Sequence, residues 1–454
     1  MPHLFTSARP LPALSESARL RYATFIAMYF AQGIPVGLLS YAIPAWLAMH
    51  AQTPAQIAGF GALIGLPWSL KLLVAPLIER FAWLPMGRRR PWLLAGQVGL
   101  TLSFAVLALL PDPLHHLTLL VAGAIAVNFF TVFQDVATDS LAIDLVPPAQ
   151  QGQANSLMWG AKLVGLTVAL AGGNWLLNHA GFGTTMLTAA ALVSGFSLLP
   201  LLLRERPGEK RLPWTAGTAS PAAARLQSET WGEIWQRMRR VFRLRDTRLL
   251  VPVVFFNFLC QTYFDASMAI FTVQQLGWTD THFSQVYSAA NLVGGVGGML
   301  LGGWLMTRLG VVRVAQVTMW GLAGLAALLG AGSALWSHSG FIVGIITAFN
   351  VINALFYISL FALAMQCCWS RVSAVQFTLY MAVASWGNSA GTALMGLVRS
   401  YWSWSATYLV LAVLVLPGLW LLYRVQLAAQ ARQLAALESA HQEEAEAPAL
   451  RVAV

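Results

Sequence analysis

Charged residues are scarce in this chain of 454 residues. Asp, Glu, Lys and Arg together make up 10% of the sequence, whereas soluble domains carry about 25%. So little charge cannot cover a large water-facing surface, which excludes a soluble globular protein of this size. Hydrophobic residues make up 57% and fall into blocks of about twenty, the length that a helix needs to cross a bilayer.

Patterns of catalysis and metal binding are also missing. The three cysteines, Cys260, Cys367 and Cys368, lie in or beside apolar blocks and indicate no disulfide framework. No Gly-Lys dipeptide occurs, which excludes a P-loop, and there is no H-E-x-x-H motif or Cys/His metal spacing. Gly387-Asn-Ser-Ala-Gly391 matches G-x-S-x-G, but that motif needs a strand-to-helix elbow, and inside an apolar helix such glycines favour close packing. The sequence predicts no enzyme, no cofactor and no metal.

Twelve apolar segments predict an all-α membrane protein. A long break after the sixth divides the chain into two six-helix halves, and weak sequence echoes between the halves indicate a duplicated transporter fold. The predicted helices span residues 22–49, 55–78, 91–110, 116–142, 152–178, 183–203, 249–271, 282–306, 312–335, 340–366, 373–398 and 403–423. The predicted regions are a segment 1–21, a half 22–203, a linker 204–248, a half 249–423 and a tail 424–454.

The linker contains a basic amphipathic stretch from Trp231 to Arg243. Such a helix lies on a membrane surface or packs against the ends of the bundle, and the pattern leaves both open. Its larger apolar residues share one face at helical spacing: Trp231, Ile234, Trp235, Met238 and Phe242.

Basic residues predict the orientation. Lys71 and Lys162 lie inside predicted helices and Arg399 lies in one inter-helix loop; all other Lys and Arg residues fall on the opposite side from Arg399. Because Lys and Arg accumulate on the cytosolic side of membranes, both termini are expected in the cytosol.

Two corresponding loops carry a recognisable motif. Ala75-Pro-Leu-Ile-Glu-Arg80 leads to Gly87-Arg-Arg-Arg90, and the second half has a weaker copy ending in Arg308 and Gly310. These loops resemble the signature loop of the major facilitator superfamily, although Glu79 replaces the usual Asp and Thr307 replaces the acid of the second copy. The resemblance implies a conformational latch on the cytosolic side, formed by Glu79, Arg80, Gly87, Arg88, Arg89, Arg308 and Gly310.

Four stretches resemble one branch of that superfamily. They are Lys71 to Arg80, Gly87 to Arg90, Gln134-Asp-Val-Ala-Thr-Asp139 and Ser373-Ala-Val-Gln-Phe377. The branch contains anhydromuropeptide permeases, single-chain siderophore permeases and acetyl-CoA transporters. The resemblance implies import by alternating access, and it is poorly specific for the substrate. Many muropeptide permeases carry two further helices that this chain lacks.

A few ionisable residues fall inside the predicted helices. Each is costly in lipid and needs a partner or a watery cavity. At 1.5 Å per residue, Lys71 and Asp135 lie about 24 and 28 Å from the outer ends of their helices, so their depths match. Asp139 shares a helical face with Asp135. The three residues form either a permanent ion pair that orients helices or a proton-coupling site, Asp135 and Asp139, with Lys71 as charge partner.

The remaining polar residues at membrane depth are candidates for contact with a substrate. Lys162 could bind an anionic group, snorkel to the surface or pair with an acid. The candidates are Lys162, Gln134, Asp265, Gln261, Tyr357 and Asn350.

The sequence therefore predicts a secondary active transporter, a proton-coupled importer of a muropeptide-like or siderophore-like solute. It is expected to be a monomer in a bacterial inner membrane, with a small-molecule substrate, protons and the lipid bilayer as partners and no nucleic acid. An exporter or an acetyl-CoA carrier is the alternative within transporters; a membrane enzyme and a channel are the alternatives outside them. Substrate, direction and coupling ion are left open.

Overall fold

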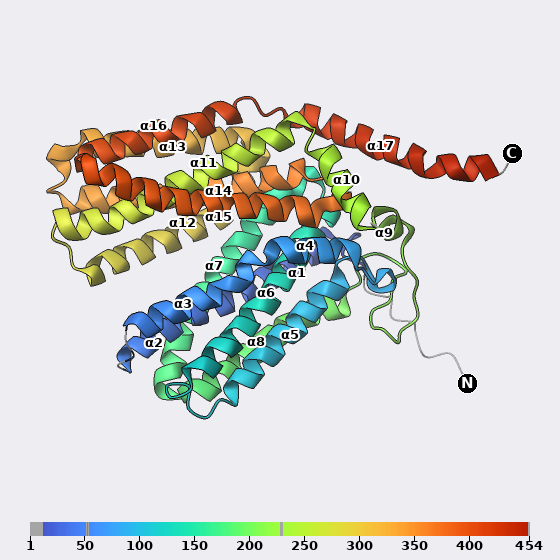
Figure 1. Cartoon of the computed structure of the whole chain (residues 1–454), viewed down its shortest axis with the longest axis horizontal. Helices are drawn as coiled ribbons and strands as arrows, with labels where there is room; N and C mark the ends of the chain where they lie inside the picture. Colours follow the sequence, from blue (N-terminus) through green and yellow to red (C-terminus); the bar gives the residue numbers. More distant parts are fainter. Residues whose placement is uncertain (1–11, 51, 53, 228–229, 453–454) are drawn as a thin grey trace, which may run out of the picture. The chain divides into compact units, whose positions relative to one another are not determined.

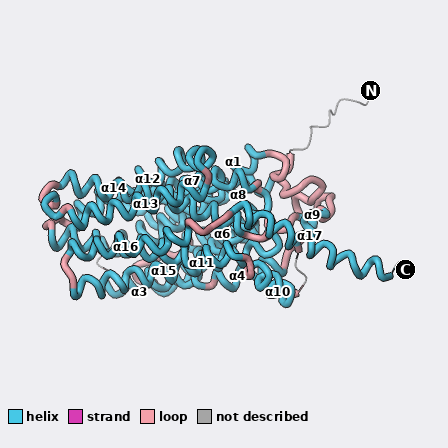
Figure 2. The backbone as a smooth tube through the Cα atoms, turned by 90° about the horizontal axis from the view of Figure 1, so that it is seen from above, coloured by secondary structure: helices cyan, strands magenta, loops and turns pink. Residues whose placement is uncertain are grey.

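The computed structural model describes residues 12–50, 52, 54–227 and 230–452, so the first eleven residues of the predicted N-terminal segment lie outside the described part. Throughout the described ranges the chain forms helices and connecting loops without a strand (Figure 2). A helix satisfies its own backbone hydrogen bonds, which lipid cannot do. The all-α fold predicted from the sequence is confirmed.

The first six predicted membrane helices are all present. The first is interrupted by a short π-helical turn that follows Pro35. They comprise α1 (Ala18–Gly37), η1 (Leu38–Ala42) and α2 (Ile43–Met49), then α3 (Pro54–Ser69) and α4 (Lys71–Arg80), α5 (Arg90–Ala108), α6 (Leu117–Leu145), α7 (Pro148–His179) and α8 (Gly181–Leu202).

The second six are present as well, and a further helix follows them. They comprise α11 (Arg245–Ile270) with η3 (Phe271–Gln275), α12 (Asp280–Leu309), α13 (Val311–Ala331), α14 (Ser339–Cys367), α15 (Ser373–Tyr401) and α16 (Trp404–Leu422), before α17 (Leu427–Val452). Short 3-10 turns lie at η2 (Leu84–Met86), η4 (Ser333–Leu335) and η5 (Ser370–Val372).

Length and hydropathy identify eleven membrane spans among the described residues. The twelfth predicted segment, 373–398, is α15, which is long enough at 29 residues. Its most apolar stretch has a lower hydropathy than those of the other eleven, because small and polar residues such as Asn388 interrupt it.

One predicted helix, 55–78, is broken in the structure. Pro67 lacks a backbone N–H and disturbs the helix around it, and α3 ends at Ser69, with Leu70 N donating to the Pro67 carbonyl in a turn. The helix restarts at Lys71, so this lysine is the first residue of α4. The break therefore places the ammonium of Lys71 in the first turn of α4.

The helices form two compact units. Unit 1 comprises the chain up to Val146 and Val164–Glu229; unit 2 comprises Pro147–Leu163 and the chain from Thr230 onward. The boundary passes through α7, whose first half packs in unit 2, where Ser156 Oγ donates to the Met299 carbonyl at 3.3 Å. The division into the halves 22–203 and 249–423 stays a prediction.

Unit 2 contains a very close helix contact at the G-x-S-x-G pattern. A Cβ on Gly391 would lie 2.2 Å from the carbonyl oxygen of Leu259, and one on Gly387 would lie 2.5 Å from that of Phe255. Only glycine allows α15 to approach α11 so closely. The interpretation of these glycines as packing residues is confirmed.

The linker is more ordered than its composition suggests. It contains α9 (Pro221–Leu226) and α10 (Trp231–Val241), and α11 begins at Arg245. α10 lies at the end of unit 2 where the chain enters α11, and α17 extends beyond the same end (Figure 1). Along its apolar face Ile234 and Met238 are buried, while Trp231 and Trp235 are exposed.

Candidate functional site

Three charged side chains meet in the interior of unit 1. Lys71 forms an ion pair with Asp135, and its Nζ lies 3.9 Å from Asp139 Oδ2. The exposed fractions of Lys71, Asp135 and Asp139 are 6%, 4% and 3%. α4 supplies the lysine and successive turns of α6 supply the two acids. The structure thus brings together the residues that the sequence singled out, and their roles stay a prediction.

α1 completes this acid cluster with two neutral side chains. The Tyr29 hydroxyl donates to Asp139 Oδ1, and Gln32 Nε2 donates to Asp135 Oδ1 at 2.5 Å. The two residues are three apart on α1 and so share a face. Both are buried. Sequence reasoning missed them, and their i,i+3 spacing on a largely apolar helix is the signal that could have found them.

Gln134, a predicted substrate contact, also belongs to the acid cluster. Its Nε2 donates to the Met28 carbonyl at 2.9 Å, while its Oε1 lies 3.4 Å from Gln32 Nε2. These bonds hold α6 against α1. Two carboxylates and an ammonium, which are titratable, are thus held together by hydrogen bonds from a phenol and an amide.

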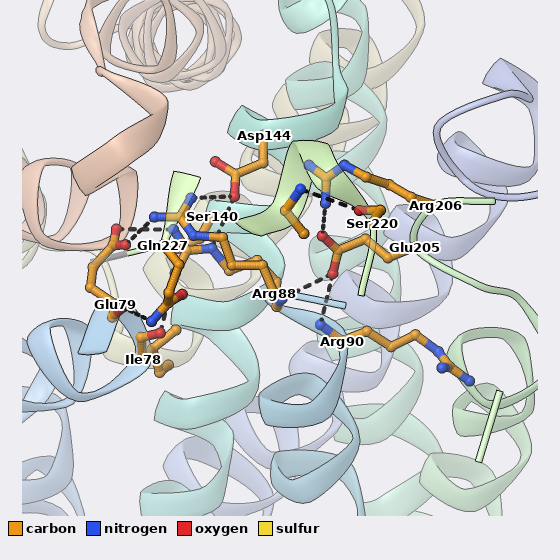
Figure 3. Close-up of polar contacts among 12 residues, drawn as sticks. Ile78, Glu79, Arg88, Arg90, Ser140, Asp144, Glu205, Arg206, Ser220 and Gln227 are labelled. Atoms are coloured by element: carbon orange, nitrogen blue, oxygen red, sulfur yellow. Dashed lines mark hydrogen bonds and ion pairs between the residues drawn. The ribbon is translucent and has the colours of Figure 1, made fainter. Parts of the chain in front are cut away.

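A second buried cluster lies at the signature loop (Figure 3). Glu79 accepts from Arg88 Nη2 at 2.5 Å and from Arg89 Nη2 at 2.9 Å. Asp144 Oδ2 accepts from Arg88 Nη1 at 2.9 Å and from Arg89 Nε at 3.0 Å. All four side chains are fully buried. The alternating charges compensate one another, as buried ions require.

The turn before these arginines depends on Gly87. Its φ is +107°, a conformation that other residues rarely adopt, and a Cβ would lie 2.6 Å from Glu205 Oε2. The Glu205 carboxylate accepts from the backbone N–H groups of Arg89 and Arg90 at 2.9 and 3.2 Å. A residue of the linker is therefore built into the signature loop.

Arg90 and Gln227 fasten the linker further. The Arg90 guanidinium donates to the carbonyls of Pro200, Leu201, Lys210 and Arg211. Gln227 Nε2 donates to the carbonyls of Glu79 and Arg80, each at 2.9 Å. The linker up to Gln227 is thus a structural part of unit 1.

Glu209 is a buried acid of this linker. Its carboxylate accepts from Arg206 N and from the Ser220 hydroxyl, both at 2.9 Å. Burial, with Glu205 adding repulsion, raises the pKa of Glu209 to about 7. This group therefore changes charge near neutral pH.

The other predicted latch residues do not join the buried cluster. The Arg80 guanidinium lies over the Phe81 ring, 5.2 Å from its centroid. In unit 2 Arg308 is exposed and stacks on Trp304, and Gly310 ends α12 with a φ of +82°. The second motif copy thus supplies a helix end and an exposed cation, because Thr307 replaces the acid that would hold the arginine.

Unit 2 encloses a cavity of about 320 Å³ with aromatic and amide walls. Trp159 and Phe361 stack with centroids 5.0 Å apart, and Tyr357 continues the stack. Gln261 Oε1 and Asn353 Oδ1 are buried there and accept no hydrogen bond from the described part of the chain. Such a site offers ring faces and unused acceptors to a polar ligand.

Three predicted substrate contacts line this cavity: Gln261, Asn350 and Tyr357. Lys162 is its neighbour, with Nζ 5.0 Å from the ring centroid of Trp159. Asp265 accepts a hydrogen bond from the Tyr287 hydroxyl and is not among the lining residues.

Comparison with known proteins agrees with this architecture. The sequence profile described as Major Facilitator Superfamily matches residues 25–377. An anhydromuropeptide permease of Escherichia coli (strain K12) is 26% identical over 407 residues, which cover 88% of this chain and 79% of the relative. The putative transporter AmpG 4 of Rickettsia felis is 23% identical over 86% of this chain and 92% of its own length.

Solved structures show the same fold at lower identity. The transporter FucP in an outward conformation has a TM-score of 0.66 and 16% identity, covering 89% of this chain and 99% of its own. The proton:xylose symporter XylE has a TM-score of 0.62 and 11% identity, over 89% and 94%. The resemblance inferred from the sequence motifs is confirmed.

Proposed function

Because the chain belongs to the Major Facilitator Superfamily and is a multi-pass membrane transporter rather than an enzyme, we propose that it imports an organic solute together with protons. Its proposed location is a bacterial inner membrane, as a monomer with both termini in the cytosol. The concentration of Lys and Arg on one side of the helices supports this orientation.

The observation that carries proton coupling is the acid cluster of Lys71, Asp135 and Asp139. A carboxylate sealed from water favours its neutral form, and one that faces water or an ammonium favours its charged form. Two carboxylates here share Lys71, and Tyr29 and Gln32 hold them from α1. Alternating access changes the exposure of such a site, which links proton occupancy to conformation.

The substrate proposed is muropeptide-like, a sugar that carries a peptide. The name of the Escherichia coli relative supports it, and the cavity of unit 2 suits it chemically. The faces of Trp159, Tyr357 and Phe361 match the apolar face of a sugar ring, and the amides of Gln261 and Asn350 match its hydroxyl and amide groups. Lys162, beside Trp159, is positioned to meet an anionic group.

The signature loop is proposed to act as the conformational latch. The compensated charges of Glu79, Arg88, Arg89 and Asp144 make a rigid anchor, while Arg80 and Arg308 are free of that cluster. The anchor fixes the loop, so that the end of unit 1 moves as one body.

The experiment is uptake of radiolabelled anhydromuropeptide into proteoliposomes under an imposed pH gradient. Wild-type protein should accumulate it when the outside is acidic. Asp135→Asn and Asp139→Asn keep size and hydrogen bonding but cannot release a proton. The variant that lacks the coupling acid should lose accumulation while exchange between equal pools survives. Asp112→Asn, at an acid with a half-exposed side chain, is the matched control.

Each part of the proposal has its own failing result. If both buried variants accumulate substrate as wild type does, neither acid couples protons, and Asp265 is the next candidate. Uptake of a ferric siderophore or acetyl-CoA but not of muropeptide would reassign the substrate. Accumulation only in everted vesicles would show an exporter.

A further inference from the structure

The outward face of α10 has an unusual composition for a helix beside water. Trp231, Trp235 and Arg239 follow one another at intervals of four residues, so they share one side of α10, and Arg243 follows two residues after the helix ends. The exposed fractions of Trp231 and Trp235 are 44% and 64%. On the adjacent side of the helix Ile234, Met238 and Val241 are buried. Tryptophan next to arginine is typical of the membrane–water interface.

A groove runs beside α10. It has a volume of about 620 Å³, and Trp235, Arg239 and Phe242 line it together with Leu379 of α15. Leu379 is the seventh residue of α15, about 9 Å along the helix from its start at 1.5 Å per residue. The groove therefore extends from α10 to the second turn of α15.

One arginine, Arg239, lines the groove, and three more follow it closely along the chain. Arg239 and Arg243 are exposed, as are Arg245 and Arg248 at the start of α11. Across the described ranges none of these four arginines forms an ion pair. Glu233, the acid of α10, pairs with Arg237 instead. An apolar floor under a cationic rim complements an amphiphile with an anionic head.

We propose that this groove binds an anionic phospholipid of the adjoining leaflet. The phosphate lies between Arg239 and Arg243, and one acyl chain runs along Trp235, Phe242 and Leu379. α10 then sets the depth of unit 2 relative to the membrane surface, at the point where the chain enters α11. The proposal is independent of substrate and proton coupling.

The test uses the full-length protein in nanodiscs and measures retention of phosphatidylglycerol against phosphatidylcholine by native mass spectrometry. Wild-type protein should retain phosphatidylglycerol preferentially. A basic residue at an anionic surface contributes about 1 kcal/mol, so Arg239→Gln should weaken retention about fivefold and the double variant with Arg243→Gln about 25-fold. Trp235→Ala should weaken retention of both lipids.

Arg313→Gln is the matched control, because Arg313 is an exposed arginine of unit 2 at the start of α13 and does not line the groove. It should leave retention unchanged. An equal loss in Arg313→Gln would show a general surface attraction and overturn the site, as would equal retention of the two lipids by wild-type protein. Arg239 and Arg243 are exposed, so equal melting of wild type and the double variant in neutral lipid is expected and confirms an intact fold.

Discussion

The buried charges at the signature loop allow a sharp stability prediction. Asp144→Asn keeps the shape of the side chain but removes its charge, leaving Arg88 and Arg89 facing Glu79 alone. Asp144 accepts from Arg88 at 2.9 Å and from Arg89 at 3.0 Å. Asn keeps an oxygen that can accept from these arginines, so the loss comes from the missing charge. Removing one charge of a buried pair costs about 3–5 kcal/mol.

Thermal unfolding in detergent, followed by the loss of helical circular dichroism, measures this cost. At about 2–4 °C per kcal/mol for a domain of 150–250 residues, Asp144→Asn should lower the melting temperature by about 6–20 °C. The same substitution at the partly exposed Asp112 should stay within about 0.5 kcal/mol of wild type. Because Arg88→Gln removes the excess positive charge, the double variant should recover part of the loss.

Two results would refute this reasoning. If Asp144→Asn has the same melting temperature as the control Asp112→Asn, the charge of Asp144 contributes no net stability. If the double variant loses more than the sum of the single losses, the charges are not compensating one another, because a compensating pair gives a coupling of the opposite sign.

Three further predictions concern other parts of the chain. Lys71→Ala should reduce expression, because it leaves Asp135 without its ammonium, and adding Asp139→Asn should restore part of it; a double variant that is worse than additive would contradict the pairing. The pKa of Glu209 is raised to about 7, so the folded linker holds a proton that the unfolded chain releases near pH 4.5. The stability of the linker should therefore fall as the pH rises from about 4.5 to 7. Hydrogen exchange over residues 203–227 should show this pH dependence, and Glu209→Gln should abolish the pH dependence. A reporter that is active only outside the cytosol, fused after Val454, should be silent, and activity would reverse the proposed orientation.

Much of the fold could be predicted because lipid imposes strong rules. Apolar length alone identifies eleven of the membrane helices, since each must satisfy its own backbone. The cost of charge in lipid identified Lys71, Asp135 and Asp139. Few charged residues lie inside the predicted helices, so each has few possible partners of opposite charge. Both arguments need only composition and depth.

The missed features depend on three-dimensional contact. Tyr29 and Gln32 are neutral, so the cost of buried charge does not single them out, and only their spacing on an apolar helix hints at a shared role before α1 is seen against α6. The linker is fastened through carbonyl groups that Arg90 and Gln227 reach, and every residue has a carbonyl, so the sequence carries no pattern for these bonds. The break at Leu70 was signalled by Pro67, but prolines are tolerated in membrane helices and a break does not follow from one alone.

The contact of α15 with α11 has a mechanical consequence. At Gly387 and Gly391 the two helices meet backbone to backbone, so no side chain lies between them that could change rotamer to allow sliding. A shift along the axis would drive a neighbouring side chain into a carbonyl. The two helices therefore move together as one rigid pair. Any bending during the transport cycle then falls on other helices. One of them is α1, which is followed by the π-helical turn η1.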